Sequence, residues 1–316
     1  MSRIFSGIQP SGTLHIGNYL GAVKNWAALQ HTHESFFCVV DYHAIIAAYE
    51  PADLRARTAD MIVSLLAAGV DPSRCTLFVQ SMVPEHTELA WIFNTLTPLG
   101  ELERQTQFKD KASREESVPA GLLNYPVLQA ADILLYRADR VPVGEDQVQH
   151  LELSREISRK WNARFDPGAG AGDAFFPEPE PLLTPSRRIM GLDGKAKMSK
   201  SLGNTVGLLE PADEIWAKLR PAVTDPKRQR RTDPGTPEVC NIYQLHKAFS
   251  PPETVQHVAV QCSTAGWGCI DCKKVLHESM ERELVPIRSR AREVAANGAL
   301  VKEMIEAGAD LSLIHI

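Results

Sequence analysis

The segment RIFSGIQPSGTLHIGN (residues 3–18) carries the clearest indication of the fold. Residues 3–7 (RIFSG) suit a short strand, and residues 9–13 (QPSGT) are rich in turn formers. A helical pattern begins near Gly17 and continues to about Gln30. The segment therefore predicts a strand that passes through a glycine-containing loop directly into a helix.

The next segments continue this alternation. Residues 36–41 (FFCVVD) form a continuous apolar run that ends on a polar residue, which is typical of a buried parallel strand. Residues 53–69 have the pattern of an amphipathic helix closed by a glycine, and residues 75–80 (CTLFVQ) are another apolar run. This order predicts an α/β fold with a doubly wound parallel sheet of the Rossmann type. Ligands of such sheets bind outside the carboxyl ends of the strands.

The composition changes beyond the first half of the chain. Residues 120–136 predict a helix, residues 140–144 a strand, and residues 145–163 a polar helix, whereas the glycines and prolines of residues 166–185 predict a linker or long loop. After Gly207 the pattern is helical, so we expect a smaller all-helical C-terminal domain. The expected division is residues 1–185 for the catalytic domain with a connecting insertion, 186–206 for a loop, 207–290 for the helical domain, and 291–316 for a C-terminal helix.

Composition excludes several classes of protein. Of the 316 residues, 44% are hydrophobic and 23% are charged, which is ordinary globular usage and excludes disorder of the whole chain. The longest nearly apolar run, residues 61–70, is too short for a bilayer span of about 20 residues. Residues 1–12 lack the apolar core of a signal peptide. We therefore expect a cytoplasmic protein without a membrane partner.

The net charge of −5 shows that bulk positive charge cannot attract a nucleic acid. A nucleic-acid partner would need a local basic patch. The run KRQRR (residues 227–231) and the pair Lys273-Lys274 are the candidates, and a solvated basic surface is the alternative explanation for both.

Two glycine-containing segments have residue types that suit phosphate binding. Residues 11–18 (SGTLHIGN) open the first helix, where free N–H groups and the helix dipole favour anions and His15 adds a donor. Residues 197–201 (KMSKS) lie between Gly194 and Gly203 and bring two lysines to a loop that could close on a triphosphate. Each segment by itself is also compatible with an ordinary turn.

Together the two segments resemble the HIGH and KMSKS signatures of class I aminoacyl-tRNA synthetases. The KMSKS match is complete, and the first signature appears as His15-Ile16-Gly17-Asn18, with asparagine for the second histidine. Four further motifs make the chain similar to bacterial tryptophanyl-tRNA synthetases over residues 4 to about 305. They are FSGIQPSG (residues 5–12), GELER (100–104), AADILLY (130–136) and VPVGEDQ (141–147).

The resemblance implies the roles of individual residues. Those implied in catalysis are Gln9, His15, Lys197, Ser199 and Lys200. The residues implied to bind ATP, together with Mg²⁺, are Gln9, Pro10, Ser11, Gly17, Asn18, Gly144, Glu145, Asp146, Ile189, Lys197, Met198, Ser199, Lys200 and Ser201. The residues implied to bind the amino acid are Phe5, His43, Tyr125, Gln129, Asp132, Val141, Val143 and Gln147.

Asp132 is implied to accept the indole N–H, which would select tryptophan. An acid in an apolar helix is costly unless it is paired, so an ion pair with Arg137 or a buried backbone contact is the structural alternative. Tyr125 and Gln147 are implied to hold the ammonium and carboxylate groups. Gln129 departs from the family, which often has methionine there, and this changes the expected shape of the pocket.

Cys240, Cys262, Cys269 and Cys272 cluster within 33 positions. Four thiolates can ligate zinc or a [4Fe–4S] cluster, and the spacing resembles that of a tryptophanyl-tRNA synthetase subgroup with a [4Fe–4S] cluster in its anticodon-side domain. Zinc and unligated thiols remain alternatives. Cys38 and Cys75 lie in strand-like runs and are expected to be buried hydrophobic residues.

The resemblance implies a homodimer that activates L-tryptophan with ATP and transfers it to tRNA(Trp). A tyrosine-specific relative and a non-catalytic tRNA or regulatory binding protein on the same fold are the alternatives. Where the family usually continues with a polar, alanine-rich helix, residues 311–316 (LSLIHI) follow instead. We therefore expect truncation or non-native sequence at this end.

Overall fold

The computed structural model describes residues 2–106, 108–109, 117–143, 148–168, 174–183 and 189–314. Within these residues five strands form one parallel sheet in the order β3-β2-β1-β4-β5. The strands are β1 (Arg3–Ile8), β2 (Glu34–Val39), β3 (Thr76–Val79), β4 (Arg140–Val143) and β5 (Glu180–Leu183). The strand order reverses its direction between β1 and β4, which confirms the predicted Rossmann-type sheet.

One face of the sheet is covered by the helices that follow β1 and β2. The first helical run consists of α1 (Ile16–Asn18), the π-helix η1 (Tyr19–Val23) and α2 (Lys24–Leu29), and the second helix is α4 (Pro51–Ala67). Trp26 of this first run stacks on Phe37 of β2 at 4.6 Å between ring centroids. This face belongs to the largest apolar core of the described residues.

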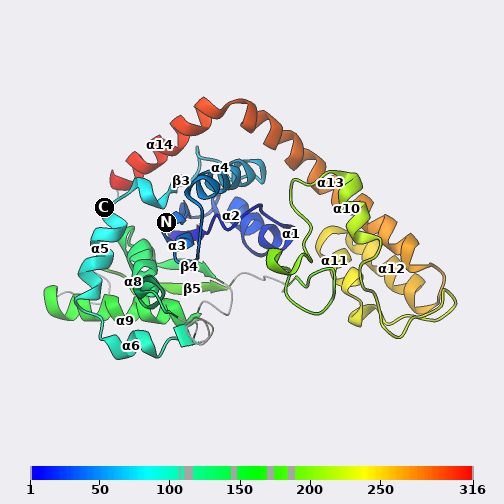
Figure 1. Cartoon of the computed structure of the whole chain (residues 1–316), viewed down its shortest axis with the longest axis horizontal. Helices are drawn as coiled ribbons and strands as arrows, with labels where there is room; N and C mark the ends of the chain where they lie inside the picture. The colour runs from blue at the N-terminus through cyan, green and yellow to red at the C-terminus, as the bar shows by residue number, and fades with distance from the viewer. Residues whose placement is uncertain are drawn as a thin grey trace.

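Helices from the middle of the chain cover the other face. They are α5 (Glu85–Asn94), α6 (Leu99–Glu103), α8 (Ala120–Leu135) and α9 (Val148–Phe165). Successive strand residues point to opposite faces, so Phe36 faces this side while Phe37 faces the first helical run. Tyr136, at the end of α8, stacks on Phe36 and Phe5 at 4.9 and 5.6 Å. The central helix α8 lies between α5 and α9 in Figure 1.

The prediction of a loop across residues 166–185 is wrong for its last part. Residues 180–183 form β5, which pairs in parallel with β4. The prolines of this stretch favoured a loop, because proline cannot donate a hydrogen bond within a sheet. However, β5 is an edge strand, where one side of the backbone needs no partner, so Pro181 is tolerated.

The C-terminal part of the described chain is helical, as expected. It contains α10 (Ala212–Leu219), α11 (Asn241–Phe249), α12 (Pro252–Ser263), α13 (Cys269–Ala296) and α14 (Gly298–Ile314). Figure 1 shows that α13 leaves this helical region and passes over the Rossmann part, where it packs on α4. None of the described helices is long and apolar enough to cross a membrane.

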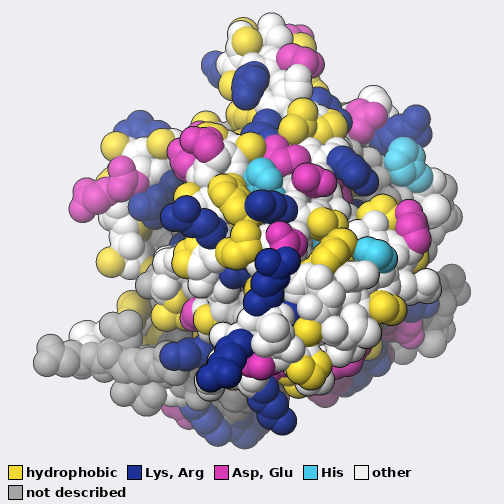
Figure 2. All heavy atoms as spheres, turned by 90° about the vertical axis from the view of Figure 1, so that its right-hand side faces the viewer, with side chains coloured by type: hydrophobic (Ala, Val, Ile, Leu, Met, Phe, Trp, Pro, Cys, Tyr) yellow, Lys and Arg dark blue, Asp and Glu magenta, His cyan; other side chains and the backbone are white. Residues whose placement is uncertain are grey.

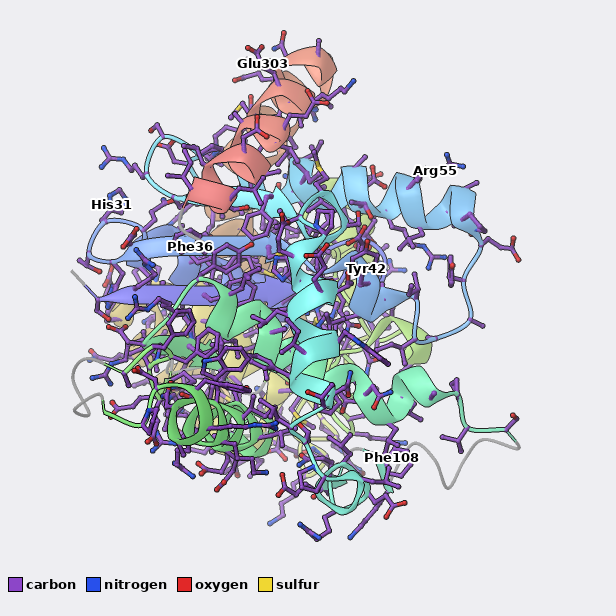
Figure 3. All side chains as sticks on the ribbon, turned by 90° about the vertical axis from the view of Figure 1, so that its left-hand side faces the viewer. His31, Phe36, Tyr42, Arg55, Phe108 and Glu303 are labelled. Atoms are coloured by element: carbon purple, nitrogen blue, oxygen red, sulfur yellow. The ribbon has the colours of Figure 1, made fainter. Side chains whose placement is uncertain are left out.

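Helix α14 returns to the sheet and packs against β3. Figure 3 shows α14, which carries Glu303, above the strand that carries Phe36. The approach is close at Gly308, where an added Cβ would lie 2.0 Å from the Leu77 carbonyl oxygen. A residue without a side chain is therefore required at this crossing.

We predict that Gly308→Ala lowers the free energy of unfolding by about 1–3 kcal/mol, because its Cβ would collide with backbone that cannot rotate away. Thermal unfolding monitored by circular dichroism measures this change. Gly298→Ala is the matched control on the same helix, since an added Cβ there meets nothing within 4 Å. Equal melting temperatures for the two variants would contradict the packing of α14 on β3.

Candidate active site

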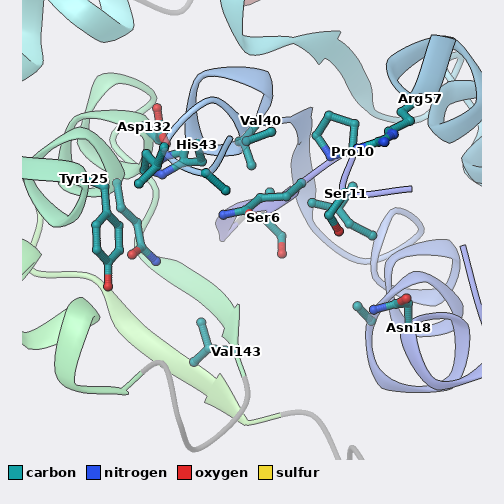
Figure 4. Close-up of a pocket in the computed structure, with 18 of the residues that line it drawn as sticks. Ser6, Pro10, Ser11, Asn18, Val40, His43, Arg57, Tyr125, Asp132 and Val143 are labelled. Atoms are coloured by element: carbon teal, nitrogen blue, oxygen red, sulfur yellow. The ribbon is translucent and has the colours of Figure 1, made fainter. Parts of the chain in front are cut away.

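A cavity of about 1140 Å³ lies at the carboxyl ends of β1 and β4. This is the point where the strand order reverses, at which Rossmann-type sheets bind their ligands. Residues from the loop after β1, from α8 and from β4 line the cavity, as Figure 4 shows. The fold therefore brings together residues that are more than 130 positions apart in the sequence.

Helix α8 supplies one wall of the cavity. Tyr125, Gln129 and Asp132 follow one another at intervals of four and three residues, which places them on one helix face, and all three line the cavity. Asp132 is only 1% exposed. Figure 4 shows its carboxylate next to His43, with Tyr125 farther along the same helix. Burial raises the pKa of Tyr125 to about 12, so its phenol is neutral at physiological pH.

The Asp132 carboxylate accepts three hydrogen bonds from other elements. His43 Nε2 donates to Oδ2 at 2.7 Å, and Gln80 Nε2 and His86 Nδ1 donate to Oδ1 at 2.7 Å each. Burial alone would raise the pKa of Asp132, but the charge and hydrogen bond of His43, and then the hydrogen bond of His86, hold it well below its usual range. Asp132 is therefore a buried, ionised acceptor in the cavity wall.

The structural alternative for Asp132, an ion pair with Arg137, is wrong. Arg137 Nη2 points instead to the Ala174 carbonyl oxygen at 3.4 Å, and its guanidinium lies over the Phe175 ring. The remaining predicted wall residues line the cavity around Asp132. They are Phe5, His43, Gln129, Val141 and Val143. Gln129, the position that departs from the family pattern, is thus part of this wall.

The loop after β1 forms the opposite end of the cavity, which Gln9, Pro10, Ser11 and Asn18 line. His15 caps the first helix, because its Nδ1 accepts the backbone N–H of Asn18 at 3.3 Å. Burial, together with the charges of Lys200 and Lys197, lowers the pKa of His15 to about 4. The imidazole is therefore neutral, and its remaining proton makes Nε2 a donor.

The loop that carries KMSKS is joined to this first loop by backbone hydrogen bonds. Ile16 N–H donates to Val206 O at 2.9 Å, and Leu208 N–H donates to Leu14 O at 2.8 Å. Asn204 organises the loop from within: its Oδ1 accepts from Ser199 N–H at 2.8 Å. No pattern in the sequence distinguishes Asn204 from an ordinary loop residue, so its role could not be predicted.

Lys200 extends from the second loop over the first. An added Cβ at Gly12 would lie 2.7 Å from Lys200 Nζ, and Gly12 has a φ of +128°, which favours glycine. Burial and the nearby charge of Arg57 lower the pKa of Lys200 to about 8. Arg57 of α4 also lines the cavity, as Figure 4 shows. Arg57 could not be predicted from the sequence, because its position on the polar face of α4 is that of an ordinary solvated charge.

Of the other predicted ATP-binding residues, those within the described part of the chain do not line the cavity. Ile189 and Met198 are buried in the core beneath the loop, and Gly17 packs against the His15 ring. Lys197 and Ser199 lie in the loop on either side of Met198. Gly144, Glu145, Asp146, Gln147 and the side chain of Ser201 lie outside the described residues. The roles of all these residues stay predictions.

The four clustered cysteines meet in the helical region. Cys240 precedes α11, Cys262 lies on α12, and Cys269 and Cys272 lie in the first turn of α13. All four line one small cavity together with Arg228 and Trp267. Burial raises the pKa of Cys240, Cys262 and Cys272. Among the described residues, no three His, Cys, Asp or Glu side chains form a ready-made metal site.

Arg228, a member of the predicted basic run, points into this cysteine cavity. Its Nη1 lies 3.9 Å from Cys262 Sγ, and its Nη2 donates to the Trp267 carbonyl oxygen. Gly235 leaves room for the same thiol, since an added Cβ would lie 2.6 Å from Cys262 Sγ. The Arg228 guanidinium therefore lies at the cysteine cavity, whereas Lys227, Arg230 and Arg231 are exposed.

Comparisons with known proteins agree with this geometry. The family model described as tRNA synthetases class I (W and Y) matches residues 1–285. The tryptophan–tRNA ligase of Deinococcus radiodurans is 54% identical over 313 residues, which cover 98% of this chain and 93% of that protein. The tryptophan–tRNA ligase of Thermosynechococcus vestitus is 45% identical over 312 residues, or 96% of this chain and 93% of that protein.

A solved structure shows the same arrangement. Tryptophanyl-tRNA synthetase from Campylobacter jejuni, complexed with ADP and tryptophan, matches with a TM-score of 0.87 and 33% identity, and the match covers 99% of this chain and 95% of that one. The sheet and its cavity thus define a class I nucleotide-binding enzyme of the Rossmann type. The chain belongs to the class I tRNA synthetases of the tryptophan and tyrosine group.

We predict that Lys200→Ala lowers the rate of ATP-dependent amino-acid activation roughly 100-fold. The change removes the cation that extends over the loop after β1, where we expect the phosphates of ATP to bind. Amino-acid affinity should change by less than about threefold, since the lysine acts on the transition state. Pyrophosphate exchange and equilibrium binding measure the two quantities. Lys195→Ala, a change at an exposed lysine of the same loop, is the control and should stay close to wild type. Equal losses of rate and affinity in Lys200→Ala would contradict this role.

Proposed function

We propose that this chain is a tryptophan–tRNA ligase. It activates L-tryptophan with ATP to give tryptophanyl-adenylate and pyrophosphate, and then transfers the tryptophan to tRNA(Trp). One observation carries the proposal: a buried, ionised carboxylate, Asp132, lies in the wall of the cavity that the phosphate-binding loop also lines. The relatives described above, which are named tryptophan–tRNA ligases, support it.

Activation needs no nucleophile from the protein. A carboxylate oxygen of tryptophan attacks the α-phosphorus of ATP, the bond to the bridging oxygen breaks, and pyrophosphate leaves with the electron pair. Neutral His15 can donate its Nε2 proton to a phosphate oxygen, while Lys200, Lys197 and Arg57 neutralise charge on the phosphates. Mg²⁺ that arrives with ATP is held mainly by the phosphates and shields their charge.

The cavity wall accounts for the choice of amino acid. Phe5, Val141 and Val143 offer apolar surface to the indole ring, and Asp132 offers an acceptor to its N–H. A ring without a donor at that place would leave one acceptor site of the carboxylate unfilled, and an unsatisfied buried acceptor is costly. Tyr125 and Gln147 hold the ammonium and carboxylate groups of the amino acid in this proposal.

For the second step we infer a tRNA partner on the helical region. Figure 2 shows Lys and Arg side chains on this face, with acidic residues between them. The exposed Lys227, Arg230 and Arg231 suit phosphate contacts, which position a nucleic acid without specifying its sequence. The proposed division into residues 1–185, 186–206, 207–290 and 291–316 assigns the tRNA contact to the third part. Charging tRNA fits a cytoplasmic location.

We also propose a homodimer. Trp91 is 72% exposed, and Ile92 on the same helix and Leu99 on the next are exposed as well. An exposed group of large apolar side chains is typical of an interface. Sedimentation measurements report the oligomeric state, and a monomer at micromolar concentration would contradict the proposal.

The proposed function predicts amino-acid-dependent pyrophosphate exchange with tryptophan at least about 100-fold faster than with tyrosine, because the site is built for a ring N–H donor. The measurement is the exchange assay across all twenty amino acids. Exchange with tyrosine instead would favour the tyrosine-specific relative. Absence of exchange with every amino acid would favour a non-catalytic tRNA or regulatory binding protein.

We further propose that Cys240, Cys262, Cys269 and Cys272 hold a [4Fe–4S] cluster, with Zn²⁺ as the alternative. The support is that four soft sulfur donors line one cavity, with the Arg228 cation beside them to offset the charge of the thiolates. When bound, such a group would cross-link α11, α12 and α13 and so stabilise a region with a small core.

The cluster predicts about four iron atoms and four sulfides per chain in protein purified without oxygen, together with a brown colour. Cys272→Ser should lose most of the iron, while Cys75→Ser, which changes a buried cysteine outside the cavity, should keep it. Iron and sulfide analysis measures both. A colourless protein with one equivalent of zinc would refute the cluster and support the alternative.

A further inference from the structure

A second layer of polar side chains lies behind the wall of the cavity. His86, near the start of α5, is 0% exposed and does not line the cavity, yet its Nδ1 reaches Asp132 Oδ1 at 2.7 Å. Its Nε2 lies 2.7 Å from the hydroxyl of Tyr136. The rings of Phe5 and Phe78 pack around the imidazole at 6.5 and 5.9 Å between centroids. His86 thus joins the cavity wall to the aromatic core.

The direction of these hydrogen bonds follows from the charge of Asp132. An ionised carboxylate only accepts, so His86 Nδ1 must donate its proton to Oδ1. In a neutral imidazole Nε2 is then an acceptor, and the Tyr136 hydroxyl donates to it. Burial raises the pKa of Tyr136, so the phenol keeps its proton. Tyr136 therefore fixes the tautomer in which His86 Nδ1 carries the proton and donates it to Asp132 in a hydrogen bond.

The same bonds determine how many acceptor sites the carboxylate has left. Two oxygens offer about four lone-pair sites. Gln80 and His86 occupy Oδ1, and His43 occupies one site of Oδ2. Gln80 and His86 lie outside the cavity wall, whereas His43 lines it. The remaining site is therefore on Oδ2, the oxygen that His43 shares with the cavity.

We propose that His86 is a specificity-determining positioning residue for tryptophan, held in its donor tautomer by Tyr136. It keeps the Asp132 carboxylate turned so that the free lone pair of Oδ2 faces the cavity and the indole N–H. The inference rests on the proposed function and extends it to residues that do not touch the substrate.

The experiment compares tryptophan with β-(3-benzothienyl)alanine, which has the same ring shape but sulfur in place of the N–H. Pyrophosphate exchange gives kcat/KM for each, and their ratio measures the contribution of the hydrogen bond. His86→Leu should reduce this ratio at least about 10-fold, mainly through a higher KM for tryptophan, since a bond to a charged group is lost. His86→Asn retains a donor near the Nδ1 position and should keep most of the ratio.

Tyr136→Phe is the second variant, because it keeps the stacked ring and removes only the hydroxyl; the ratio should fall less than in His86→Leu. His277→Asn is the control, since His277 bonds the Ala212 carbonyl at 2.8 Å, far from this wall in the sequence.

An unchanged ratio in His86→Leu, or equal losses for both substrates, would overturn the inference. If His86→Leu does not fold, the ratio in Tyr136→Phe decides in the same way. A wild-type enzyme without tryptophan-dependent exchange would overturn the proposed function itself.

Discussion

The buried charge of Asp132 is the constraint on which the rest of the site depends. An ionised carboxylate that is 1% exposed is stable only when several donors surround it. Its donors come from α3 (Asp41–Ala44), from the 3₁₀-helix η2 (Gln80–Met82) and from α5. The first two of these elements directly follow β2 and β3. The carboxyl ends of these parallel strands lie at one edge of the sheet, and two of the donors to the acid of α8 are therefore placed there.

At the other end of the cavity the charges have the opposite sign. Burial, together with the charges of Lys200 and Lys197, lowers the pKa of His15 to about 4. Burial and the charge of Arg57 lower the pKa of Lys200 to about 8. Crowded cations repel one another, so this arrangement is favourable only toward an anion. A polyphosphate that enters between the two loops would neutralise the lysines and raise the pKa of Lys200. The end of the cavity with the cations is thus complementary to an anionic substrate. The end with Asp132 is complementary to an apolar group that carries an N–H donor.

The sequence predicted the parts of this design that have local causes. Strands β2 and β3 are apolar runs, and Asp132 is conspicuous because it interrupts an apolar helix. His86 and Gln80 were missed because their role depends on a carboxylate 46 and 52 positions away, which no local pattern reveals. Strand β5 was missed for a different reason: proline content predicts a loop unless the strand is known to lie at a sheet edge. The role of a residue was therefore predictable where neighbouring residues in the same segment determine its surroundings, and not where segments distant in the sequence determine them.

The C-terminal helices are tied to the catalytic part rather than appended to it. Glu283 of α13 accepts hydrogen bonds from the Tyr19 hydroxyl and from Lys24 Nζ, each at 2.6 Å. Tyr19 begins the π-helix that follows the His15 loop, and π-helices are frequent at functional sites. The first turn of the same 28-residue helix carries Cys269 and Cys272. One continuous helix therefore carries two of the clustered cysteines at its first turn and contacts the helical run after the His15 loop through Glu283.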